Sequence, residues 1–172
     1  MPKFKSVQNR PETMEFVVAT GKLLQNFGTV ELLTYEWIRV LATDPMLFHL
    51  ARNLKLADRV DLVKRLVEDD RFPLDPSART SILEILANLR PLIEVRNTVA
   101  HSPVSLGFKD NDPSKVTIVR GVLNMKPKDR TKDAELISLE EINGTVNRSS
   151  SIARQLEDWL SQVEATIHEK KT

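Results

Sequence analysis

Apolar side chains recur every three or four residues along several long stretches of this chain. That spacing matches the period of an α-helix and gathers the apolar residues on one face. Only five glycines occur among 172 residues, which disfavours a turn-rich β fold. The sequence therefore predicts a mainly all-α protein, built as a bundle of four to five helices. Its length fits a single domain over residues 1–172.

Prolines and capping residues set the expected helix boundaries. Five helices are expected, over residues 12–42, 46–53, 56–69, 77–100 and 139–169. Pro91 lies inside the fourth pattern and is expected to bend that helix rather than divide it. Gly21 and Gly28, seven residues apart, are expected to lie on the same side as part of the apolar stripe of the first helix and to let another helix approach it closely. The side chains expected to face the core are Leu23, Phe27, Val30, Trp37, Leu41, Leu56, Val60, Val63, Val67, Ile82, Leu86, Leu89 and Ile93.

A short β-like region precedes the last helix. Residues 115–120 and 122–126 alternate weakly between apolar and polar side chains, and residues 126–130 have the composition of a turn. Residues 134–137 are a further strand candidate. We therefore expect a small β-hairpin insertion before the last helix, which Ser138 and Glu141 begin as a capping box.

Composition excludes several classes of chemistry. The chain has no cysteine, which rules out disulfides, thiolate zinc sites and cysteine nucleophiles, and fits a reducing, cytoplasmic location. The N-terminal residues hold no apolar run of the kind found in secretory signals. No stretch of about 18 uncharged apolar residues occurs, so no membrane association through a spanning helix is expected.

Charge is unevenly distributed, although the net charge is only +1. Residues 109–132 hold seven basic residues against three acidic ones, whereas residues 133–172 hold eight acidic residues against four basic ones. These two segments are either solvated faces that attract each other or, for the basic one, a surface that contacts phosphates.

One short motif carries side chains suited to catalysis. Residues 92–103 read LIEVRNTVAHSP, so Arg96 and Asn97 precede His101 near the end of the fourth predicted helix. Five residues of ideal helix turn Arg96 and His101 about 140° apart, whereas Asn97 and His101 share a face. Because proline disfavours the α conformation at the preceding residue, Pro103 is expected to end the helix near His101. The histidine can then swing toward the arginine, or meet a second copy of the motif.

The R-N-x-x-A-H pattern resembles the HEPN superfamily, in which paired motifs line one cleft of a dimer. The resemblance implies a HEPN-like helical bundle that acts as a homodimer and cleaves RNA without a metal or another cofactor. In that reaction the RNA 2′-hydroxyl attacks the adjacent phosphate. Arg96 would bind the phosphoryl oxygens, His101 would transfer a proton, and Asn97 would orient the histidine or a phosphate oxygen. The family's toxins and phage-defence factors further imply an antitoxin protein as a partner.

The sequence is also compatible with two other functions. The same groove suits a non-catalytic module that binds RNA or a nucleotide, which predicts binding without cleavage. The long helices also suit a protein-interaction platform. In the simplest structural role, Arg96 and His101 cap their helix and bond to the hairpin, because a cationic histidine is favourable at a helix C-terminus.

Overall fold

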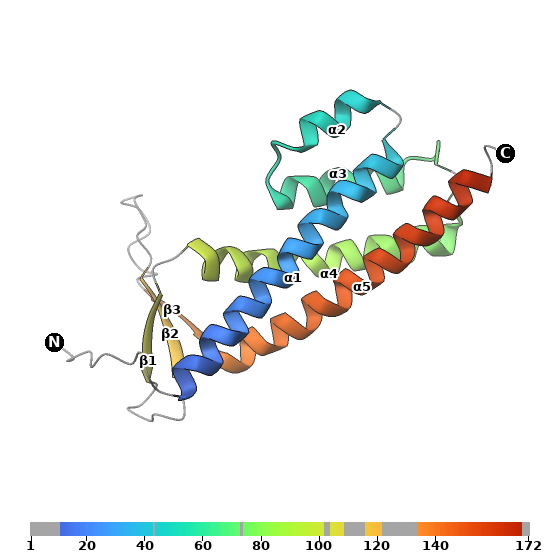
Figure 1. The fold of residues 1–172 in the computed structure, drawn as a ribbon. Helices are drawn as coiled ribbons and strands as arrows, with labels where there is room; N and C mark the ends of the chain where they lie inside the picture. Colours follow the sequence, from blue (N-terminus) through green and yellow to red (C-terminus); the bar gives the residue numbers. More distant parts are fainter. Residues whose placement is uncertain are drawn as a thin grey trace. The chain divides into compact units, whose positions relative to one another are not determined.

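The computed structural model describes residues 11–42, 44–72, 74–101, 104–108, 116–121 and 134–169. These ranges contain five helices and three short strands (Figure 1). In chain order they are α1 (Pro11–Leu41), α2 (Pro45–Ala51), α3 (Leu56–Glu68), α4 (Pro76–His101), β1 (Val104–Phe108), β2 (Val116–Gly121), β3 (Ala134–Ser138) and α5 (Leu139–Glu169). The prediction of a mainly helical chain is confirmed, and α4 is one helix despite Pro91. In the described ranges, no helix combines the length and apolar character that membrane crossing requires.

The described residues fall into two compact units. Unit 1 takes its residues from Met1–Gln25 and Glu94–Asn147, and unit 2 takes its residues from Asn26–Ile93 and Arg148–Thr172. Helices α1, α4 and α5 each supply one segment to both units. The single domain over residues 1–172 stays a prediction.

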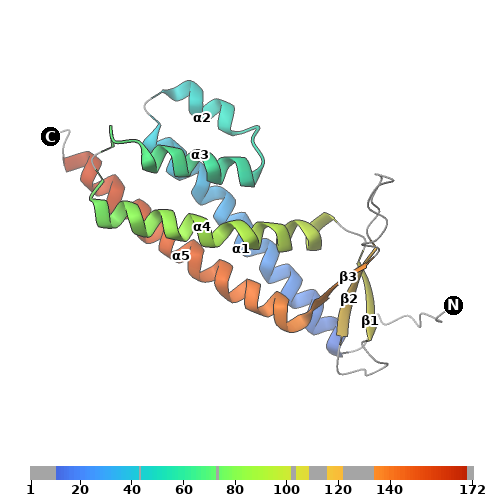
Figure 2. The ribbon, with the colours of Figure 1, turned by 180° about the vertical axis from the view of Figure 1, so that it is seen from behind.

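Unit 2 has a core of large apolar side chains. Trp37 of α1 has no exposed surface, and its Nε1 donates a hydrogen bond of 3.1 Å to the carbonyl oxygen of Leu156 in α5. The short α2 lies beside α3 in both views (Figures 1 and 2). The predicted inward-facing side chains of α1, α3 and α4 are all buried, as the apolar spacing indicated. Apolar burial of this kind supplies most of the free energy that favours a helical fold.

A buried cation lies among the helices of unit 2. Arg59 of α3 is only 5% exposed, and its Nη1 donates a hydrogen bond to the hydroxyl of Tyr35 in α1. The Nη2 atom lies 3.5 Å from Oε2 of Glu31, and the guanidinium carbon lies 4.1 Å from the centre of the Tyr35 ring. The Tyr35 hydroxyl in turn donates to the carbonyl oxygen of Arg52 at 3.0 Å. Tyr35 and Glu31 thus compensate for the burial of the Arg59 charge.

Replacing Tyr35 with phenylalanine is expected to lower the free energy of unfolding by about 1–2 kcal/mol. The ring and its contact with Arg59 remain, but a buried charged donor loses its acceptor. Chemical denaturation of the two proteins measures the difference. Replacing Tyr35 in an Arg59→Met background should cost distinctly less, because the donor is then absent. Equal losses in both backgrounds would contradict this account.

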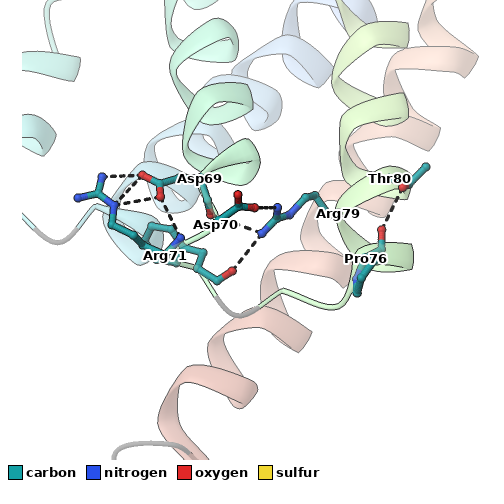
Figure 3. Close-up of polar contacts among 7 residues, drawn as sticks. Asp69, Asp70, Arg71, Pro76, Arg79 and Thr80 are labelled. Carbon is teal, nitrogen blue, oxygen red and sulfur yellow. Dashed lines mark hydrogen bonds and ion pairs between the residues drawn. The ribbon is translucent and has the colours of Figure 1, made fainter.

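The turn between α3 and α4 is held by ion pairs (Figure 3). Arg79 of α4 pairs with Asp70 at 2.5 Å and also donates to the carbonyl oxygen of Phe72 at 3.2 Å. Asp69 accepts three hydrogen bonds from the Arg71 guanidinium and one from the Arg71 amide. The Arg71 side-chain hydrogen bonds, followed by the amide one, lower the pKa of Asp69 to about 2. Arg79 therefore joins the first turns of α4 to the turn that follows α3.

Asp69→Asn is expected to lower the melting temperature at pH 6 but not near pH 2. A carboxyl whose pKa is lowered on folding stabilises the folded state above its unfolded pKa of about 3.9. That contribution disappears as the pH falls through about 2. Thermal unfolding of the wild type and the variant between pH 6 and pH 2 tests this. Arg71→Gln should show the same pH dependence, and a difference that persists unchanged at pH 2 would refute it.

The three strands of unit 1 form one antiparallel sheet in the order β1-β2-β3 (Figure 1). The predicted two-stranded hairpin is not the pairing found. β2 pairs with β1 on one edge and with β3 on the other, so residues before position 109 supply a strand that the prediction missed. The predicted strand 122–126 and turn 126–130 lie outside the described residues.

The serine half of the predicted capping box is found at the start of α5. The hydroxyl of Ser138 accepts a hydrogen bond of 3.0 Å from the backbone N–H of Glu141, which satisfies one of the helix's free donors. Thr145 and Ile142, one turn further on, have no exposed surface. The cap and the buried first turns together hold this end of α5 in unit 1.

The prediction that Gly21 and Gly28 let a neighbouring helix approach is wrong within the described residues. A Cβ atom built at either position would meet nothing within 4 Å. Both glycines are exposed, because the buried stripe of α1 lies on its other side. The sequence pattern could not distinguish a glycine that contacts a neighbour from one that faces open space.

Candidate functional site

The candidate site lies at the C-terminal end of α4, in unit 1. Helix α4 ends at His101, close to the predicted end at Ala100. Val99 is buried and holds this last turn against the unit, whereas Asn97 and Ala100 are exposed. Asn97 therefore lies on the solvent-exposed side of this end of α4.

The structure brings Arg96 and Asn97 together. The Nη1 atom of Arg96 donates a hydrogen bond of 3.1 Å to Oδ1 of Asn97. Arg96 is half-buried, and its Nε atom is shielded from solvent while Asn97 is exposed. Because one end of the guanidinium is held by a neighbouring amide, its planar fork has a preferred orientation near the surface. An oriented guanidinium loses less entropy when it binds an anionic group.

The relation between Arg96 and His101 follows from the helix. Since α4 is helical through position 101, the two residues leave the backbone about 140° apart. Asn97 and His101, four residues apart, lie on one side of the helix. The side chain of His101 and residues 102 and 103 lie outside what the structure describes. The interaction of an Arg96 guanidinium with the His101 imidazole therefore stays a prediction.

Glu94, two residues before Arg96, is exposed on α4. Glu31 of α1 lies in unit 2, where it pairs with the buried Arg59 of α3. The buried Arg59 was missed at the sequence level. Arg59 lies three residues after Leu56 and four before Val63, so it falls on the buried face of α3. This spacing was the sequence signal from which the burial of Arg59 could have been predicted.

The basic segment 109–132 is described only at β2. Within that strand, the register places Arg120 opposite Glu135 of β3, so a basic and an acidic residue occupy facing positions. Lys109, Lys115, Lys126, Lys128, Arg130 and Lys132 lie outside the described residues. Whether this segment contacts phosphates stays a prediction.

Within the described residues no metal site is found, and the comparisons identify no relative of the chain. In the part of the chain that the structure describes, no three acidic or histidine side chains are grouped so that they could hold a metal ion. Comparisons with protein-family models, with curated proteins and with solved structures found no match.

Proposed function

We propose that this chain is a metal-independent endoribonuclease of the HEPN type that acts as a homodimer. The observation that carries the proposal is the hydrogen bond from Arg96 to Asn97 at the end of α4, immediately before the histidine of the motif. This bond supports a guanidinium with a preferred orientation at the end of the helix, which suits it to bind an anionic group. The helical bundle and the resemblance of the R-N-x-x-A-H motif support the same class.

The chemistry assigned to the motif needs no group beyond its side chains. The RNA 2′-hydroxyl attacks the adjacent phosphorus as its proton passes to a neutral imidazole. The bond from phosphorus to the 5′-oxygen breaks, and a protonated imidazole gives its proton to that oxygen. The products are a 2′,3′-cyclic phosphate and a 5′-hydroxyl. Arg96 neutralises charge on the phosphoryl oxygens, where preorganised donors act most strongly.

A homodimer meets the need for both an acid and a base. Each chain carries one motif histidine, His101, and in-line transfer benefits from a base at one oxygen and an acid at the other. A second copy of the chain supplies the second imidazole. Proton transfer of this kind accelerates reactions by about 10²–10⁴-fold, with the unperturbed histidine pKa of about 6.5 well suited to neutral pH.

Incubation with RNA in EDTA is expected to yield cleavage products that end in a cyclic phosphate. A matched oligonucleotide that carries 2′-deoxyribose at the cleaved position should stay intact, because the nucleophile is then missing. Total RNA and transfer RNA serve as first substrates, and end analysis identifies the products. Binding of RNA without cleavage at any tested site would instead assign the chain to the non-catalytic binding class.

The proposed biological role of the chain rests only on the resemblance of its motif to the HEPN superfamily. A toxin restrained by an antitoxin protein, or a phage-defence factor, would act on RNA in the cytoplasm. Co-expression with its genomic neighbours, scored by growth of the host, tests this role separately from the chemistry.

A further inference from the structure

We draw no further inference here: the strongest candidate, the exposed apolar face of α1 between Met14 and Leu24 in unit 1, carries no proposal because nothing in the described residues shows what covers it.

Discussion

Replacing Trp37 with alanine is expected to lower the free energy of unfolding by about 3–5 kcal/mol. Trp37 has no exposed surface, and it joins two helices because its ring packs in the unit 2 core while its Nε1 bonds to Leu156 of α5. The substitution removes the largest side chain of that core and leaves a cavity that a close-packed interior fills only partly. Folded domains have free energies of unfolding of about 5–15 kcal/mol, so the variant would lose much of its stability.

Chemical denaturation monitored by circular dichroism measures this loss. Trp37→Phe keeps most of the apolar volume and should cost much less, about 1–2 kcal/mol. Leu32→Ala serves as the surface control in the same helix, because Leu32 is 60% exposed and should change stability by no more than about 0.5 kcal/mol. Similar losses for Trp37→Ala and Leu32→Ala would show that the core is not centred on Trp37.

The helical part of the fold could be predicted because its signal is local. Leu23, Phe27 and Trp37 repeat with the helical period, and each is fully buried. The hydroxyl of Ser138 caps α5 as the spacing to Glu141 indicated. These features depend on a few neighbouring residues and on the geometry of one helix, so a single sequence contains them.

The sheet was harder to predict because strand pairing is not local. β1 is only five residues long, and although its sequence VSLGF alternates, that pattern does not name a partner. In the structure it pairs along its whole length with β2, from Val104 opposite Arg120 to Phe108 opposite Val116. Pairing depends on which segments meet in space, and a short apolar run does not encode its partner. The same limit applies to Gly21, whose surroundings are set by other helices and not by its own neighbours in sequence.

Only those features of the candidate site that depend on a single helix could be predicted from the sequence. The end of α4 near His101 was predicted from Pro103, a signal in the local sequence. The hydrogen bond from Arg96 to Asn97 was not predicted. The buried Arg59 was missed because its partners Tyr35 and Glu31 lie on a different helix. The pairing of two motifs across a dimer depends on contacts between copies, and the sequence of one chain does not specify those contacts directly.

Arg96→Ala is expected to lower the rate of RNA cleavage by about 10²–10³-fold while leaving the fold intact. The substitution removes a preorganised hydrogen-bond donor that stabilises charge on the phosphoryl oxygens. Such a donor stabilises the transition state by about 3–4 kcal/mol. Arg96→Lys keeps the positive charge but cannot form the paired hydrogen bonds of the guanidinium, so it should recover only part of the activity. Cleavage under single-turnover conditions measures the rate.

His101→Ala is expected to lower the same rate by about 10²–10⁴-fold, because the proton donor and acceptor are both lost from the symmetric site. The chain offers matched controls for both positions. Arg90 lies in the same helix and pairs with Asp61 at 2.6 Å, and His49 lies exposed on α2 in the other unit. Arg90→Ala and His49→Ala should therefore cleave at the wild-type rate. If Arg96→Ala and His101→Ala were as active as these controls, any nuclease activity of the chain would have to arise elsewhere, and the motif would be left with its structural role at the end of α4.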